Sequence, residues 1–275
     1  MAEPPVILDT VTKLGPADAG RVAVCASHGG VYAAWCAARA GVRAVLLCDA
    51  GIGREEAGVA GLAWLDGLGL PAAALAHDRS RIGDGADAWA RGVVSRANRA
   101  AAALGVRPGQ RTAEAVERLE AAPASRSEVP AIGESRVRLA EACRPGVEVW
   151  ALDSVSLVRS EDAGQVIVTG SHGGLLGGRP ETAVRTDVFA ALFNDAGIGV
   201  DEAGTTRLPA LDVRGIAGAT VDAFTARIGD GRSSFAEGVV SRVNARARAL
   251  GGRPGMAAAE LVDLLVAARQ RELGR

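Results

Sequence analysis

Short apolar segments alternate with longer amphipathic segments along this chain. Continuous apolar runs are typical of buried strands, and apolar positions spaced three and four residues apart are typical of helices. The first half predicts strands at 22–26, 42–48 and 72–76, and helices at 31–40, 54–68, 84–104 and 112–119. Such alternation predicts a mostly parallel sheet with helices on both faces.

The second half of the chain repeats the first. Residues 8–30 and 152–174 agree at 12 of 23 positions, and residues 49–58 and 195–204 agree at 8 of 10. The sequences RIGDG and GVVSR occur unchanged in both halves. Agreement over several matching stretches is the sequence signature of an internal duplication.

We therefore expect an α/β protein built by tandem duplication of a Rossmann-like or flavodoxin-like parallel-sheet unit. Two copies of one fold usually pack about a pseudo-twofold axis. The expected divisions are a first repeat at 1–121, a linker and connecting helix at 122–146, and a second repeat at 147–275. The linker is placed there because 121–134 is rich in proline, serine and charge.

Composition narrows the class of protein. The chain has 275 residues, of which 48% are hydrophobic and 23% charged, as expected for a packed globular protein. Its net charge of -1 disfavours a nucleic-acid binder. We expect no membrane association, because no apolar run is long enough to span a bilayer. No secretory pattern is visible, and the four cysteines show no CxxC spacing, so the cytoplasm is the expected compartment.

The matching segments fall mainly where predicted strands end. In a parallel sheet these ends share one edge, where ligands bind. Ser27 and His28 precede Gly29 and Gly30 at the end of the first buried strand. Their counterparts in the second half are Ser171, His172, Gly173 and Gly174.

This Ser-His-Gly-Gly turn has a catalytic and a structural interpretation. A hydroxyl and an imidazole can supply a nucleophile and a base, and glycine N–H groups at a helix start can bind an anion. In the structural alternative, the serine caps the helix and the histidine binds a carbonyl group. Neighbouring side chains in a strand point to opposite sides, so Ser27 and His28 need not touch.

Acidic and basic residues recur at the same predicted edge. Asp49 and Asp195 would orient the histidines, act as bases or hold a substrate hydroxyl, or would cap the next helix. Arg81 and Arg227 would bind a substrate carboxylate or phosphate, or would form salt bridges. The other expected ligand-binding residues are Gly51, Gly197 and Arg179. Ser95, Arg96 and Asn98, with their counterparts Ser241, Arg242 and Asn244, are expected inside the long helix, in packing or in contacts between repeats.

Several familiar cofactor and metal motifs are missing. Glu56 stands where a dinucleotide loop needs glycine or alanine, and the single lysine, Lys13, precludes a P-loop. Three scattered histidines disfavour a zinc site, so we expect no cofactor and no dedicated metal, with weak Mg²⁺ binding at Asp49 or Asp195 left open.

The two Ser-His turns lead into different segments. The first continues into a helical segment, whereas the second continues into a loop that contains Gly177, Gly178, Arg179 and Pro180. We expect the first turn to stabilise charge and the second to act as a gate or specificity element.

These features favour a metal-independent cytoplasmic enzyme that acts on a small carboxylated metabolite, with a hydrolase as the leading reaction. The catalytic candidates are Ser27, His28 and Asp49 together with Ser171, His172 and Asp195. The alternative is a non-catalytic protein that binds a small anion or metabolite. A purely structural subunit is less favoured, and homo-oligomerisation is left open.

Overall fold

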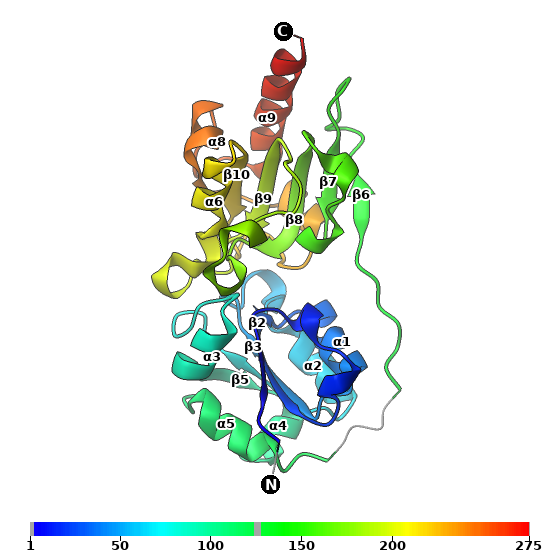
Figure 1. Cartoon of the computed structure of the whole chain (residues 1–275), viewed down its shortest axis with the longest axis vertical. Helices are drawn as coiled ribbons and strands as arrows, with labels where there is room; N and C mark the ends of the chain where they lie inside the picture. Colours follow the sequence, from blue (N-terminus) through cyan, green and yellow to red (C-terminus); the bar gives the residue numbers. More distant parts are fainter. Residues whose placement is uncertain (1–2, 124–127, 275) are drawn as a thin grey trace.

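The computed structural model describes residues 3–123 and 128–274. The chain forms two α/β units, stacked along the long axis in Figure 1, which we call unit one (residues 3–121) and unit two (residues 136–274). Unit one has a five-stranded sheet of order β1-β2-β3-β4-β5, and unit two a six-stranded sheet of order β11-β10-β9-β8-β7-β6. The strands are parallel except β5, β6 and β11, which join the edges antiparallel. The predicted α/β class is confirmed.

Both units follow a similar order of elements. The strands of unit one are β1 (Val6–Leu8), β2 (Val22–His28), β3 (Ala44–Cys48), β4 (Ala72–Leu75) and β5 (Val94–Ala97). Its helices are α1 (Val31–Ala40), α2 (Ala60–Gly67), α3 (Gly85–Arg91), α4 (Arg99–Ala103) and α5 (Thr112–Leu119). The strands of unit two are β6 (Arg136–Arg138), β7 (Val149–Leu152), β8 (Val166–His172), β9 (Ala190–Asn194), β10 (Ala217–Val221) and β11 (Val240–Val243). Its helices are α6 (Arg207–Val213), α7 (Gly231–Ala236), α8 (Ala245–Ala249) and α9 (Ala258–Leu273).

Each sheet has two buried faces because successive strand residues point to opposite sides. In β2, Ala23 and Cys25 pack beneath α1 and α2. The alternate residues Val22 and Val24 point to the other face, where they pack beneath α3, α4 and α5. Buried strands of this kind read as continuous apolar runs, which is why the sequence revealed them.

The prediction of one long helix at 84–104 is wrong. The chain instead forms α3, then β5, then α4. Val93 and Val94 follow Gly92, and β-branched residues favour the extended backbone that lets β5 pair with β4. Ser95 and Arg96 therefore lie on a strand, and Asn98 caps α4 by accepting a hydrogen bond from the Ala101 N–H. Unit two breaks in the same way, with Ser241 and Arg242 on β11 and Asn244 capping α8.

Two other expected helices also differ. Within the described residues of 122–146 there is no helix, and β6 pairs antiparallel with β7 as part of the sheet of unit two. The expected linker includes residues 124–127, which lie outside the described residues. The helix expected at 54–68 begins only at Ala60, because Glu55 and Glu56 have positive φ angles of 53° and 54°.

The two units meet through contacts that occur in equivalent pairs. The Arg54 N–H donates to the Ala223 carbonyl at 2.7 Å, and the Val200 N–H donates to the His77 carbonyl at 2.9 Å. Arg54 is equivalent to Val200, and His77 is equivalent to Ala223, because equivalent residues here are 146 positions apart. Exchanging the two units therefore converts one contact into the other. Paired contacts of this kind are what a pseudo-twofold arrangement produces.

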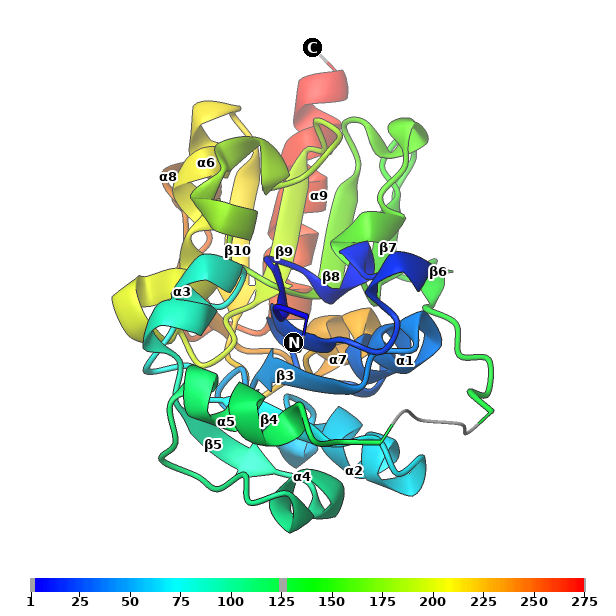
Figure 2. The ribbon, with the colours of Figure 1, turned by 60° about the horizontal axis from the view of Figure 1, so that its bottom comes forward.

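Small residues allow the units to approach closely at the centre of this interface. A Cβ added to Gly51 would lie 2.8 Å from the Cα of Gly197. Around them, Ala50 and Ala196 belong to an apolar cluster that joins both units. Figures 1 and 2 both show β3 of unit one on the side of its unit that faces β8 and β9 of unit two. The strand ends that carry the Ser-His turns therefore face the same region.

Candidate functional site

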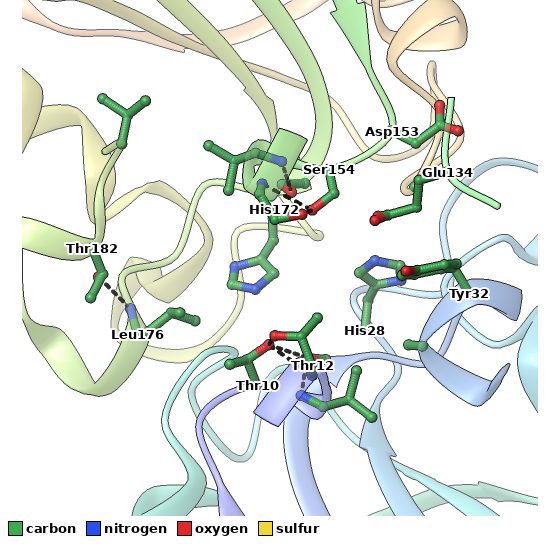
Figure 3. Close-up of a pocket in the computed structure, with 18 of the residues that line it drawn as sticks. Thr10, Thr12, His28, Tyr32, Glu134, Asp153, Ser154, His172, Leu176 and Thr182 are labelled. Carbon is green, nitrogen blue, oxygen red and sulfur yellow. Dashed lines mark hydrogen bonds between the residues drawn. The ribbon is translucent and has the colours of Figure 1, made fainter. Parts of the chain in front are cut away.

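A cavity of about 300 Å³ lies between the two units. Both Ser-His turns line it, together with the segments that follow β1 and β7. In Figure 3, His28 and His172 occupy its middle, with Tyr32 and Glu134 on one side and Leu176 and Thr182 on the other. A volume of this size fits a small metabolite.

The two histidines are held in the same way. The Gly30 N–H donates to Nδ1 of His28 at 3.2 Å, and the Gly174 N–H donates to Nδ1 of His172 at 3.2 Å. An Nδ1 that accepts a hydrogen bond carries no proton, so the neutral ring has its proton on Nε2. Neither Nε2 has a hydrogen-bond partner within the described part of the chain, and both side chains line the cavity.

Both histidines are neutral near pH 7. Burial lowers the pKa of His28 to about 4. Burial also lowers the pKa of His172 well below its ordinary value, and the charge of Arg207 adds to this effect. The cavity therefore receives two neutral Nε2–H donors, one from each unit.

The serines of the two turns are engaged with backbone rather than with the histidines. Ser27 Oγ accepts a hydrogen bond from the Val11 N–H at 3.0 Å. Ser171 Oγ accepts one from the Val155 N–H at 2.9 Å. Each serine thereby anchors the short turn after β1 or β7. Both line the cavity, but no hydrogen bond joins either one to a histidine in the described structure.

Asp49 and Asp195 lie at the unit interface, outside the cavity lining. Asp49 Oδ1 accepts hydrogen bonds from the Gly51 N–H and from the N–H and Nδ1–H of His77, at 3.1, 3.0 and 2.9 Å. Asp195 Oδ1 accepts from the Gly197 and Ala223 N–H groups, both at 3.0 Å. Neither aspartate orients the histidine of a Ser-His turn, so the expected Ser-His-Asp constellation is not assembled.

The two aspartates have opposite electrostatics. Burial opposes ionisation of Asp49, but hydrogen bonds from His77 and Ser95 outweigh it and lower the pKa of Asp49. Burial raises the pKa of Asp195, which hydrogen bonds from Ser241 and the backbone only partly offset. Two positions contribute to the difference: His77 of unit one is replaced by Ala223 in unit two, and Ala76 is replaced by Asp222, whose charge raises the pKa of Asp195 further.

The expected glycine donors are already used inside the protein. The Gly29 N–H donates to the Cys48 carbonyl, and the Gly173 N–H donates to the Asn194 carbonyl, both at 2.8 Å. The Gly30 and Gly174 N–H groups serve the histidines. These donors hold the turns in place and shape the cavity rather than pointing freely into it. Gly51 and Gly197 serve the close approach of the units.

The expected anion-binding arginines form ion pairs between the units. Arg81 pairs with Asp201 at 2.9 Å, and Arg227 pairs with Glu55 at 3.3 Å, so these two contacts are again equivalent. Arg179 pairs with Asp9 at 3.3 Å. All three arginines lie outside the cavity lining.

Four cavity residues were not expected from the sequence. Tyr32 lies on α1, and Arg207 begins α6. Glu134 precedes the edge strand β6, and Asp153 follows β7. Asp153 matches Asp9 in the repeat, which is a signal that could have been noticed. Arg207 matches Gly61, and Glu134 lies in the presumed linker, so the repeat gave no indication of either.

Carboxylates collect on the Tyr32 side of the cavity. Burial raises the pKa of Glu134, and the charge of Asp153 contributes to this rise, while hydrogen bonds from Tyr32 and Ser154 oppose it. Burial also raises the pKa of Asp153, against hydrogen bonds from the Ser135 and Gly231 N–H groups. A carboxylate with a raised pKa accepts a proton more readily, so Glu134 is suited to act as a general base.

Neither a metal cluster in the described residues nor a known relative indicates what this cavity binds. Within residues 3–123 and 128–274, no three His, Cys, Asp or Glu side chains gather in a way that could hold a metal ion. No described helix is both long and apolar enough to cross a bilayer. Comparisons of the chain with protein-family models, curated proteins and solved structures found no match. The function is therefore argued from the site alone.

Proposed function

We propose that the protein is an enzyme that moves a proton next to a carbonyl group of a small metabolite bound between the two units. The carrying observation is the pair of neutral Nε2–H donors, His28 and His172, which face one cavity. A neutral imidazole whose Nδ1 accepts a backbone hydrogen bond can polarise a carbonyl group through Nε2–H. Donors fixed before the reaction stabilise the negative charge that develops on the oxygen.

Glu134 supplies the second half of this chemistry. Proton abstraction beside a carbonyl needs a base close to the donors that hold the oxygen. Glu134 lies on the same cavity beside Tyr32 and Ser154, and its burial favours proton uptake. The carbon acid would give its proton to the Glu134 carboxylate while its oxygen gains charge at the histidines.

The hydrolase favoured by the sequence would use this site differently. His28 and His172 would stabilise the oxyanion of an attacked carbonyl group. Ser27 and Ser171 accept backbone hydrogen bonds and have no adjacent base, so water would replace serine as the nucleophile. Proton transfer is the better-supported reaction, because it uses the donors and the carboxylate as they stand.

Exchange of substrate hydrogen with solvent tests the proposal. The protein is incubated in D₂O with a panel of small 2-oxo, 3-oxo and 2-hydroxy acids, and loss of carbon-bound ¹H is followed by NMR. We expect exchange in at least one compound. His28→Ala and His172→Ala should each slow it about 100-fold, the usual cost of losing one oxyanion donor, and Glu134→Gln should slow it similarly. His77→Ala is the matched control, because His77 lies outside the cavity and its counterpart is already alanine.

Two results would contradict this proposal. One is exchange that survives in the His28→Ala, His172→Ala double variant. The other is turnover of a parallel panel of esters, amides and lactones that depends on Ser27, which would restore the serine hydrolase. Ligand binding without any exchange or hydrolysis would favour the non-catalytic alternative.

A further inference from the structure

Arg207 is a buried cation in the wall of the cavity. It is 2% exposed, and it begins α6 behind His172. Its Nε donates to the Gly174 carbonyl at 3.0 Å, and its Nη1 donates to the carbonyls of Thr182 and Ala183. These bonds hold the loop at 175–189, which follows the second Ser-His turn.

The positive charge of Arg207 has no negative partner in the described structure. It forms no ion pair there, and its Nη2 makes no hydrogen bond. The Nη2 atom is not fully enclosed by protein, and Arg207 lines the cavity. This edge of the guanidinium is therefore open to a ligand. Burial lowers the pKa of Arg207 to about 10, which still leaves it charged near pH 7.

Burying an unpaired cation is costly unless something compensates it. The carbonyl groups supply part of the compensation, and the Phe193 ring, 5.1 Å from the guanidinium carbon, supplies a little more. Neither carries a full negative charge. An anionic group in the cavity would complete the compensation and would occupy the open Nη2.

Unit one has no equivalent cation. Gly61 stands at the matching position, where an added Cβ would lie 2.6 Å from the Gly29 and Gly30 carbonyl oxygens. Unit one fills this space with α1, whereas unit two fills it with the guanidinium of Arg207. The positive charge therefore belongs to one side of the cavity only.

We propose that Arg207, with the Nε2–H of His172, binds an oxyanion group of the ligand, such as a carboxylate or a phosphate. The proposal rests on the proposed function for the choice of this cavity as the ligand site. It replaces Arg81 and Arg227 as the reason for expecting an anionic substrate. Its chemistry is ordinary, because a guanidinium and a neutral N–H donor both favour a charged oxygen acceptor.

The opposite side of the cavity gives the ligand a direction. In Figure 3, Thr182, whose carbonyl Arg207 holds, lies across the histidines from Glu134. Glu134 and Asp153 would repel a second anionic group on their side. We therefore expect a ligand whose oxyanion lies at Arg207 and whose reacting carbon lies toward Glu134.

Binding of simple probes tests this site without any turnover. Malonate, inorganic phosphate and neutral malonamide are titrated into the full chain at pH 7, with affinity measured by calorimetry and the histidine ring signals followed by NMR. We expect malonate or phosphate, but not malonamide, to bind and to shift the His172 signals more than those of His77. Whichever of the two anions binds more tightly identifies the group.

Variants separate anion binding from loop support. Arg207→Met should weaken binding about tenfold or more, because a charge-assisted hydrogen bond is lost. Arg214→Met is the matched control: Arg214 also holds this loop, through the Val184 carbonyl at 2.6 Å, but lies outside the cavity lining. Arg185→Met should have a smaller effect, because Arg185 is an exposed part of the lining.

The outcomes remain decisive even if Arg207→Met fails to fold, since the wild-type titration stands alone. Failure of both anions to bind, equal binding of malonamide, or binding that leaves the His172 signals unchanged would each overturn the proposal. Equal losses in Arg207→Met and Arg214→Met would do so too. Anion binding without hydrogen exchange would remove the enzyme proposal and leave this site intact. Hydrogen exchange in the panel of acids, without binding of malonate or phosphate, would do the reverse.

Discussion

Unit one and unit two share a sheet and a histidine turn, but they cover one face of that sheet differently. In unit one, α1 follows the turn and packs against α2, where Gly61 leaves room for it. In unit two, the loop at 175–189 follows the turn, and Arg207 fills the space beneath it. The same frame thus carries a helix on one side and a loop held by a buried arginine on the other.

This difference separates the features that both units have from those that only one unit has. Both units supply an Nε2–H donor, and the placement of these donors depends on the backbone turns that the units share. The divergent part supplies charge, with Arg207 on one wall and Tyr32 beside Glu134 on the other. A cavity between such units can bind a ligand in one orientation, although its frame is nearly symmetric.

The largest expected loss of stability comes from adding a side chain at Gly61 of unit one. Gly61→Ala would place a methyl group 2.6 Å from two carbonyl oxygens and from the Ala34 Cβ. Backbone atoms cannot move aside cheaply, so we expect a loss of about 3 kcal/mol in the free energy of unfolding, as in overpacked cores. Urea denaturation measures it.

Gly67→Ala is the control within the same helix. Nothing lies within 4 Å of an added Cβ at Gly67, so this substitution should be neutral or stabilise by about 0.5 kcal/mol. Similar stability of the two variants would show that α1 does not depend on Gly61.

The next effect contrasts the two interface aspartates. Asp49→Asn removes a buried charge that holds His77, and we expect it to cost about 2 kcal/mol at pH 6, in the range for hydrogen bonds to charged groups. Asp195→Asn removes a charge that burial already disfavours, so its free energy of unfolding should change little or rise. Urea denaturation of both variants at pH 6 compares them. Equal losses would mean that His77 does not distinguish the units.

The sequence predicted most of the fold because its signals were local. Buried parallel strands appear as apolar runs, and the helices at 31–40 and 112–119 have the predicted bounds. The helix expected at 84–104 failed because alanine-rich segments on both sides of β5 continue a helical pattern through it. Pairing with β4 makes residues 94–97 a strand, and β4 is too distant in the sequence for a local pattern to indicate that pairing.

The site was harder to predict, because its members depend on how the two units pack. The sequence placed His28 and His172 at strand ends, and the structure brings both to one cavity. It gave no indication that Asp49 would bind His77 instead, since Ala50 and Ile52 adopt positive φ angles of 48° and 63° to make that turn. Few non-glycine residues adopt such angles, so no local rule predicts them. Arg207 and Glu134 lie outside the repeated segments, where a comparison of the halves carries no information.

A smaller, pH-dependent effect is expected for His77→Ala, which gives unit one the residue of unit two. The hydrogen bond to Asp49 raises the pKa of His77, against the effect of burial. A raised histidine pKa stabilises the fold fully below the unfolded value near 6.5, and the gain is lost as pH rises through the folded value. The depressed pKa of Asp49 stabilises above about pH 4. We therefore expect a loss of about 1 kcal/mol between pH 5 and 6 that shrinks toward pH 9, measured by urea denaturation across this range. A loss that grows with pH would contradict the pairing.

The last and smallest effect concerns charge alone, and it compares the two equivalent histidines directly. NMR titration of the ring protons should give a pKa above 6.5 for His77 and about 4 for His28, and burial together with the charge of Arg207 should hold the pKa of His172 well below 6.5. Arg207→Met should raise the pKa of His172 and leave that of His77 unchanged, because removing a nearby cation favours the protonated ring. His28 and His172 both titrating near 6.5 would mean that their rings are not held neutral. The two Nε2–H donors would then be present only above that pH, and the proposed chemistry would lose the feature that carries it.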